Sequence, residues 1–457
     1  MNPETPDAPT SSLGEQVLSP LMDRLRLANG RYAAGYPGDS ARRQPVHTVY
    51  GGAHLFRADT AARLGAIARA ALDRYAPDPG TLARVVGLPE DDTHADTLRE
   101  RVVAKLEREP VEDFRLDFED GYGNRPDEEE DRDAARAAAQ VAAGLARGTL
   151  PPYLGIRVKP LNEELRGRSA RTLDLFVTAL VEQTGGRLPL NFVITLPKIT
   201  IPEQAAVFAD MLAALEAKLG LEEGALVFEF MVELPQIVLG ADGRSPLPRV
   251  LQESRGRAIA AHFGTYDYTA ASGITAAHQT MHHPSCDFAR QMMQVAFAGT
   301  GLWLSDGSTN ILPVPPHRDA EGERSEAHER ENRQVMHHAW RRHYDDVSES
   351  LRRGFYQGWD LHPAQLVTRY TAVFSFFLSG LDPAGERLRN FVDKAAQATL
   401  VGAVFDDAAT GQGLLNYFLR GINCGAVTEA ETMERTGLTL EELRGRSFVK
   451  IMQARRA

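Results

Sequence analysis

The chain has 457 residues, of which 43% are hydrophobic and 25% are charged, and its formal net charge is −11. These values are ordinary for a globular protein. The acidic balance argues against a broad nucleic-acid-binding surface, which needs clustered Lys and Arg, but it does not exclude anionic substrates held by a local group of basic side chains.

The number of cysteines and the hydropathy of the chain indicate the compartment and the solvent in which the protein is found. Only Cys286 and Cys424 occur, without metal-ligand spacing, which is typical of a reduced compartment. The N-terminus lacks a basic-then-apolar signal pattern, and no apolar run approaches the roughly 18 residues that a membrane span needs. We therefore expect a cytoplasmic protein that binds neither membranes nor nucleic acid.

In chain order, residues 1–45 are rich in Pro, Ser, Gly and Arg and predict a loosely ordered tail with one helix around Leu18–Leu27. From residue 46, short apolar runs alternate with longer amphipathic segments rich in Ala and Leu. Eight candidate strands are found at 47–51, 114–119, 153–158, 192–197, 225–233, 261–266, 301–305 and 356–361. This alternation predicts an α/β fold, a (β/α)8 TIM barrel over residues 46–381. A helical C-terminal extension is expected over 382–457, where Thr439 and Glu442 have capping-box spacing.

A doubly wound open sheet is the alternative architecture. It would be favoured by a glycine-rich phosphate loop after an early strand, and the sequence has neither a GxGxxG nor a Walker motif. The count of eight strands instead suits a closed barrel.

Charged residues alternate with apolar ones inside the predicted strands. In 114–119 the apolar residues alternate with Arg115, Asp117 and Glu119, and in 225–233 they alternate with Glu229 and Glu233. One apolar face should meet the surrounding helices, which leaves the charged face inside the barrel. Buried charges are costly unless they are paired or bound to metal, so the pattern predicts a polar site inside the barrel.

The ends of the predicted strands carry both carboxylates and cations. Barrel enzymes place their functional groups at the carboxyl ends of the strands, and Mg²⁺ prefers a few carboxylates together with water and substrate oxygens. The residues found there are Asp117, Glu119, Asp120, Arg157, Lys198, Glu233, Asp267, Asp306 and His362.

Six segments in order over residues 46–370 resemble the HpcH/HpaI aldolase and citrate lyase beta-subunit superfamily, which has a phosphoenolpyruvate/pyruvate-type TIM barrel. They read DFED at 117–120, GIRVKPL at 155–161, LPKI at 196–199, VELP at 232–235, GTYDY at 264–268, and GFYQGW running into LHPAQ at 354–365. No single segment is specific, but their order and their positions at strand ends are.

The resemblance implies a metal site and an anion-binding arginine. Glu233 and Asp267 would hold Mg²⁺, and Arg157 would bind the substrate's carboxylate or enolate oxygen. Glu119 and Asp120 would orient Arg157 or metal-bound water.

Lys198 and Asp306 are further candidates for substrate binding. The implied activity is a Mg²⁺-dependent carbon–carbon lyase or aldolase, acting on 2-oxo or 3-hydroxy acids or their acyl-coenzyme A thioesters through a metal-stabilised enolate. Coenzyme A would then enter as part of the substrate. Relatives also imply a homo-oligomer.

Structural alternatives remain open for these residues. Glu233 and Asp267 could form an ion-pair network at the barrel rim, and Arg157 could simply neutralise neighbouring acids. Strict alternation points Lys198 outward unless Pro197 ends the strand first. Asp306 fits a general base and a turn former equally well.

We expect structural rather than catalytic roles for the histidines. His362 precedes Pro363 and is typical of a helix start. His278, His282 and His283 lack a fourth ligand at zinc spacing, so we expect a solvated or pocket-lining group.

Two positions depart from the superfamily pattern, Lys159 and Thr200, and for this reason no specific substrate is assigned. Two other functions remain as alternatives. One is a malate-synthase-like condensing enzyme, and the other is a non-catalytic barrel that binds an organic acid.

Overall fold

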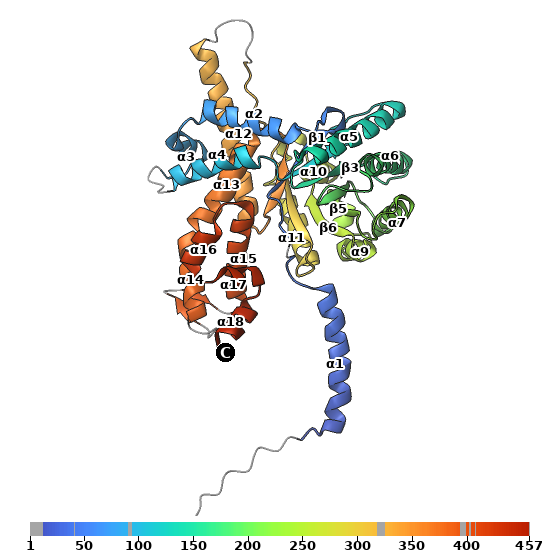
Figure 1. Ribbon diagram of the computed structural model, residues 1–457, viewed down its shortest axis with the longest axis vertical. Coiled ribbons are helices and arrows are strands. Elements are labelled where there is room, and N and C mark those ends of the chain that lie inside the picture. The colour runs from blue at the N-terminus through green and yellow to red at the C-terminus, as the bar shows by residue number, and fades with distance from the viewer. Residues whose placement is uncertain are drawn as a thin grey trace, which may run out of the picture.

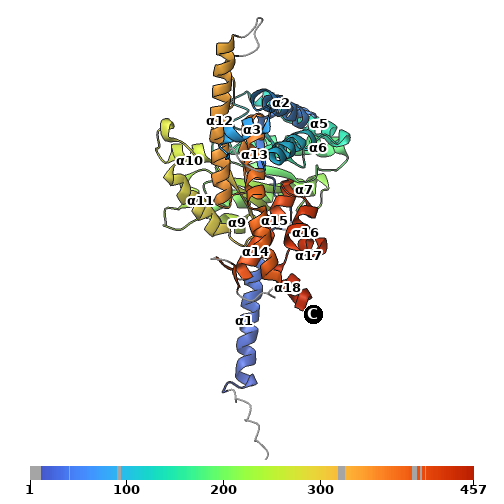
Figure 2. The same ribbon diagram turned by 90° about the vertical axis from the view of Figure 1, so that its left-hand side faces the viewer.

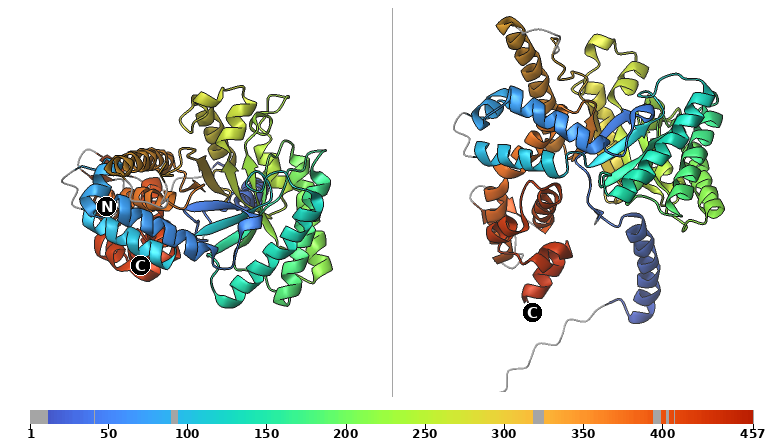
Figure 3. Two further views of the ribbon diagram at one scale, coloured as in Figure 1. Left: turned by 90° about the horizontal axis from the view of Figure 1, so that it is seen from above. Right: turned by 45° about the horizontal axis from the view of Figure 1, so that its top comes forward.

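Eight parallel strands form a closed barrel in the computed structural model, which describes residues 12–40, 42–89, 94–317, 325–393, 399–401, 404–406 and 408–456. β1 pairs with both β2 and β8, and this pairing closes the sheet. Figure 3 shows the barrel from above with helices around it. The strands are β1 His47–Gly52, β2 Asp113–Asp117, β3 Tyr153–Arg157, β4 Phe192–Leu196, β5 Val227–Val232, β6 Ala258–Phe263, β7 Trp303–Ser308 and β8 Gln357–Asp360. The predicted TIM barrel is therefore confirmed, and all eight strands lie close to their predicted positions.

Helices connect successive strands and cover the outside of the barrel. Those of the barrel are η1 Ala53–Leu55, α2 Thr60–Tyr75, α3 Pro79–Val86, α4 Ala95–Arg108, α5 Asp127–Arg147, α6 Arg166–Thr184, α7 Pro202–Leu219, α8 Pro235–Val238, α9 Leu247–Glu253, α10 Thr265–Ala271, η2 Ala276–His278, α11 Pro284–Phe297, α12 Glu326–Arg352 and α13 Gln365–Ser379. The long α12 rises above the strands in Figure 2. Its N-terminal half is thus at the end of the barrel where the strands finish.

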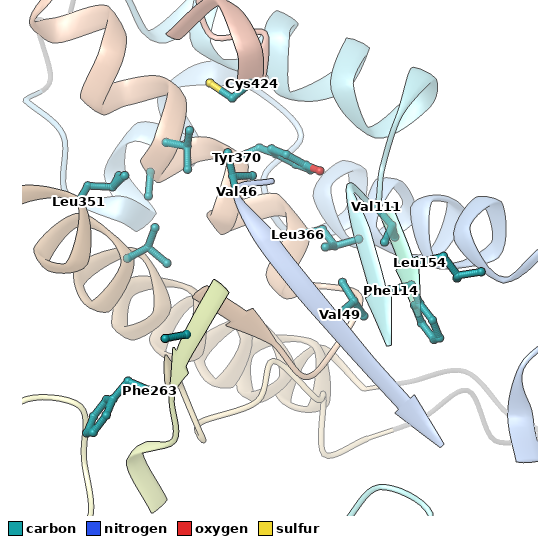
Figure 4. Close-up of a cluster of buried hydrophobic side chains, with 14 of the residues drawn as sticks. Val46, Val49, Val111, Phe114, Leu154, Phe263, Leu351, Leu366, Tyr370 and Cys424 are labelled. Carbon is teal, nitrogen blue, oxygen red and sulfur yellow. The ribbon is translucent and has the colours of Figure 1, made fainter. Parts of the chain in front are cut away.

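The apolar face of each strand meets these helices. Leu116, Ile156 and Phe228 are fully buried in one continuous core with the inner faces of the helices. Figure 4 shows part of this core, where Phe114 and Leu154 lie beside adjacent strands. Because side chains alternate along a strand, this packing leaves the charged residues inside the barrel, as the sequence predicted.

The sixth strand is shorter at its carboxyl end than predicted. The prediction ran to Tyr266, whereas β6 ends at Phe263 and Gly264 is the residue before α10. Asp267 consequently lies in the first turn of a helix rather than directly after a strand.

The remaining elements lie below the barrel in Figure 1. α1 Glu15–Gly35 is longer than the helix predicted around Leu18–Leu27, and none of its residues is buried. The C-terminal extension comprises α14 Leu381–Asp393, β9 Thr399–Val401, β10 Val404–Asp406, α15 Ala408–Cys424, α16 Glu429–Thr436, α17 Leu440–Gly445 and α18 Phe448–Arg456. The capping box is confirmed, with Thr439 and Glu442 bonded to each other's backbone N–H.

The antiparallel β9–β10 pair was not predicted. Across the described residues, we find no helix with the length and apolar character that a membrane crossing requires.

Candidate active site

Functional side chains from five consecutive segments meet at the carboxyl ends of β2 to β6. Each segment places its polar group where the strand finishes and the chain turns into the next helix. The group consists of Asp117 at the end of β2, Glu119 and Asp120 after β2, Arg157 at the end of β3, Lys198 after β4, Glu233 after β5 and Asp267 in α10. We call this group the mouth cluster. It unites seven of the nine strand-end residues predicted from the sequence.

Arg157 is held from below by two carboxylates. Its Nε donates to Asp117 Oδ1 at 2.7 Å, and its Nη1 lies 3.0 Å from Glu119 Oε2. Its guanidinium also lies 4.8 Å from the centre of the Tyr50 ring. Burial alone would lower the pKa of Arg157, but Asp117 and Glu119 outweigh it and raise that pKa well above its usual value. The guanidinium is therefore a fixed positive charge.

The loop after β2 is wrapped around Asp117. The backbone N–H groups of Glu119 and Gly121 donate to its two carboxylate oxygens at 3.0 and 2.7 Å. A Cβ at Gly121 would approach Asp117 Oδ2 to 2.5 Å, so glycine is needed for this close approach. Asp117, which the sequence placed at the strand end without a specific role, is thus the residue that positions Arg157.

Lys198 reaches into the mouth because its backbone is left-handed. β4 ends at Leu196, and Lys198 has φ of 49°, so its side chain does not follow the strand alternation that would have pointed it outward. Its Nζ lies 3.1 Å from Asp120 Oδ2 and 3.2 Å from Asp267 Oδ2, and it also donates to Glu119.

The charge state of Lys198 follows from these neighbours. Burial alone would lower its pKa, but Glu233 and Glu119 outweigh burial, so the pKa is raised and the ammonium stays charged at neutral pH.

Glu233 is the most deeply buried carboxylate on the β5–β6 side of the mouth, with 1% of its surface exposed. Its Oε1 accepts a hydrogen bond of 2.6 Å from the backbone N–H of Lys198. Burial, together with the nearby Asp267 carboxylate, raises its pKa to about 8 despite Lys198. A Cβ at Gly264 would lie 2.4 Å from Glu233 Oε2, so a side chain at this position would push the carboxylate aside.

The mouth cluster has more acids than cations. Five carboxyl groups share it with two cationic side chains, and a proton on Glu233 at neutral pH offsets only part of this excess. Glu119 Oε2 is buried and accepts no hydrogen bond, although Arg157 lies within ion-pair distance. A divalent cation would offset the remaining negative charge, so the chemistry of the donor set fits Mg²⁺.

Glu233 and Asp267 are the carboxylates that the sequence resemblance assigns to such an ion. Among the described residues no three His, Cys, Asp or Glu side chains form a ready cation cage. Mg²⁺ commonly takes only one or two protein carboxylates, with water and substrate completing its shell. Because the Lys198 ammonium lies 3.2 Å from Asp267 Oδ2, a bound cation and this ammonium would share the Asp267 carboxylate.

Asp306 lies apart from the mouth cluster. Its carboxylate is fully buried and accepts two hydrogen bonds from Arg290 Nη1 of α11, at 3.1 and 3.0 Å, and one of 2.6 Å from Ser350 Oγ of α12. These contacts tie β7 to the two helices packed around it. The structure therefore does not bring Asp306 together with the predicted site.

The histidines take structural positions. His362 Nδ1 accepts the backbone N–H of Ala364 at 3.2 Å just before α13, in keeping with a helix start. His283 caps α11 by accepting the N–H of Ser285, and His282 pairs with Asp346 at 2.7 Å.

A second buried network lies beneath the mouth cluster. Arg115 donates from Nε and Nη2 to the two carboxylate oxygens of Glu229, both at 2.9 Å, and it also binds Asp113. His262 lies 3.0 Å from the same glutamate. This network occupies the interior where other barrels have apolar layers, and it supports the floor of the mouth.

The family model described as "Domain of unknown function (DUF6986)" matches residues 25–451. The chain belongs to this family. No curated protein matches the DUF6986 chain.

Two solved structures are similar to this chain at low sequence identity. A citrate lyase from Burkholderia xenovorans LB400 is 17% identical with a TM-score of 0.54, and the match covers 86% of the DUF6986 chain and 97% of that chain. A Haloferax volcanii malate synthase in its magnesium/glyoxylate complex is 15% identical with a TM-score of 0.45, covering 89% and 98% of the two chains. The first of these similarities shows a related TIM-barrel fold.

Proposed function

We propose that this DUF6986 chain is a Mg²⁺-dependent carbon–carbon lyase or aldolase. Its substrates would be 2-oxo or 3-hydroxy acids, either free or as acyl-coenzyme A thioesters. The observation that carries the proposal is the position of the Arg157 guanidinium, locked by Asp117 and Glu119 beside the separate carboxylate pair Glu233 and Asp267. Such a site can bind an acid and stabilise negative charge that develops next to a carbonyl.

Arg157 would bind and orient the anionic end of the substrate. Its Nε and Nη2 are used by Asp117, which leaves Nη1 directed toward Glu119 and the mouth. A charge-assisted hydrogen bond from this fixed donor would stabilise an enolate more than the ground-state ketone. The Tyr50 ring and Met231 Sδ, which lies 3.8 Å from Nη1, limit the access of water to the guanidinium.

Lys198 and Glu119 are suited to hold protons at defined atoms. Lys198 stays protonated at Nζ and would contribute positive charge at the Asp267 side of the mouth. Burial raises the pKa of Glu119, whereas Arg157 and Lys198 outweigh burial and lower that of Asp120. Glu119 is therefore the better acceptor for the proton that leaves a substrate hydroxyl when the carbon–carbon bond breaks.

A magnesium ion held by Glu233 and Asp267 would supply Lewis-acid stabilisation of a substrate oxygen. The residues of the chain determine where that oxygen lies. Arg157 orients the acid from the β3 side, and Gly264 leaves room for the Glu233 carboxylate on the opposite side.

The test is turnover of a panel of 2-oxo acids, 3-hydroxy acids and hydroxyacyl-coenzyme A esters, with Mg²⁺ or with EDTA. Wild type is compared with Glu233→Gln and Arg157→Lys, and with Glu222→Gln as the control, because Glu222 is an exposed carboxylate at the opposite rim of the barrel. Cleavage that needs metal, Glu233 and Arg157 but not Glu222 is expected, and the active compound names the substrate.

The alternatives give different results in the same assay. Condensation of an acyl-coenzyme A with a 2-oxo acid, without cleavage of any panel member, would indicate the malate-synthase-like reaction. Binding of acids without any turnover would indicate a non-catalytic barrel. Cleavage that is unaffected by EDTA and by Glu233→Gln would contradict the metal assignment.

A further inference from the structure

A cavity of about 610 Å³ lies at the end of the barrel opposite the mouth cluster. Its lining includes Val46, Trp303 and Tyr356, which stand at the amino ends of β1, β7 and β8. Two other walls are helix α15 of the C-terminal extension and the strap, by which we mean residues 37–40 and 42–44. Its volume is within the range of about 300–1,000 Å³ typical of small-molecule sites, which often lie between a domain and its extension.

One wall of the cavity is apolar. It is formed by side chains of α11, β7, α12 and α13, namely Phe297, Leu304, Leu351, Val373 and Phe377. Figure 4 shows Val46, Leu351 and Cys424, three of the lining residues, on different elements around this region. This wall can accept the body of an apolar ligand.

The opposite wall is a row of polar side chains on α15. Gln412, Asn416 and Arg420 are spaced by four residues, so they share one face of the helix, and all three line the cavity. Asn416 donates to Asp39 at 2.8 Å and Arg420 donates to Gln44 at 3.0 Å, both on the strap. This polar face therefore joins α15 to the strap beside the cavity.

Positive charge dominates this cavity in a chain whose net charge is −11. Arg42, Arg420 and Arg446 line it, and Asp39 is its single lining carboxylate among the described residues. Within the described part of the chain, the side chain of Arg446 has no ion pair or hydrogen bond. Three guanidinium groups against one acid favour an anionic ligand.

We propose that this cavity binds an amphipathic organic anion, with a carboxylate or phosphate at the arginines and an apolar body against the barrel floor. The site is separate from the mouth cluster because its lining residues stand at the amino ends of the strands. A bound ligand would contact the barrel, the strap and α15 together, so it would stabilise the extension against the barrel.

The test is a binding titration of the full-length protein with octanoate, octyl phosphate, octanol and inorganic phosphate, followed by calorimetry and by tryptophan fluorescence. We expect saturable binding of octanoate or octyl phosphate, at least tenfold tighter than octanol or inorganic phosphate, and the stronger of the two identifies the acid group. Trp303 lines the cavity, so Trp303→Phe should lose the fluorescence change that accompanies binding.

Two arginine variants test whether the guanidinium groups bind the anion. Arg446→Gln removes a positive charge without breaking an ion pair or a hydrogen bond of the described protein. Arg420→Gln removes a positive charge and also the hydrogen bond from Arg420 to Gln44 of the strap. Each variant should lower the affinity for the anion at least tenfold and leave the affinity for octanol unchanged. Its circular dichroism spectrum should match that of wild type. Absence of saturable binding, equal affinity for octanol and octanoate, or an unchanged affinity in Arg446→Gln would overturn the proposal.

Discussion

Replacing Arg115 by Met would remove the cation that two buried carboxylates share inside the barrel. Arg115 is 1% exposed and makes two hydrogen bonds of 2.9 Å to Glu229, besides its contact with Asp113. Breaking a buried ion pair from one side typically costs about 3 to 5 kcal/mol, because the partner charge stays buried without compensation. Because the unfolding entropy is about 2 cal/mol/K per residue, we expect the thermal midpoint of a domain of this size to fall by about 4 to 7 °C.

The loss of stability in Arg115→Met should depend on pH, because it arises from the charge of Glu229. In wild type, burial would raise the pKa of Glu229, but Arg115 and His262 outweigh it and hold that pKa below its usual value. Glu229 therefore stabilises the fold at pH values above the pKa that its carboxyl group has in the unfolded chain. This contribution is lost as the pH falls through the lower pKa of the folded protein. In Arg115→Met the Glu229 pKa would rise above the unfolded value, so the variant gains stability relative to wild type as the pH falls from 8 to 5.

The assay is thermal and urea unfolding of both proteins at pH 5, 6, 7 and 8. The double variant Arg115→Met/Glu229→Gln serves as the control and should recover most of the loss, because burial already raises the pKa of the remaining Asp113. A loss below about 1 kcal/mol at pH 8, or a loss that grows toward pH 5, would show that Arg115 does not compensate a buried charge on Glu229.

Three further predictions concern single contacts. Asp117→Asn should lower kcat by about 10- to 100-fold, since Arg157 loses its main anchor; steady-state kinetics that match wild type would contradict this. Gly264→Ala should weaken Mg²⁺ binding at least tenfold in calorimetry, because the new Cβ displaces the Glu233 carboxylate, and an unchanged affinity would remove Glu233 from the metal site. Thr439→Ala should cost about 1 kcal/mol by removing the α17 capping box, with faster amide exchange in α17 as the measurement; unchanged exchange would count against the cap.

The barrel could be predicted because its signals are local. Each strand is a short apolar run, and the alternation of Arg115 and Asp117 with apolar neighbours already indicates which face is internal. Arg157 and Glu233 lie at the ends of such runs, so their meeting at one end of the barrel follows from the parallel topology.

Contacts between distant segments could not be predicted in the same way. Asp306 binds Arg290 and Ser350 from two other helices, and nothing in its local sequence indicates these partners. Lys198 depends on a left-handed backbone at a non-glycine residue, which alternation does not reveal. The cavity beside α15 depends on how the extension packs against the barrel floor.

Exchange of the methyl protons of pyruvate in D2O, followed by proton NMR, is the direct test of an enolate-stabilising site, because it detects enolate formation before the natural substrate is known. We expect wild type with Mg²⁺ to accelerate the loss of the methyl signal. EDTA, Glu233→Gln and Arg157→Lys should each abolish this acceleration, whereas Glu222→Gln should not. Exchange no faster than in buffer, under conditions where pyruvate binding is saturated, would contradict an enolate-stabilising site in this barrel.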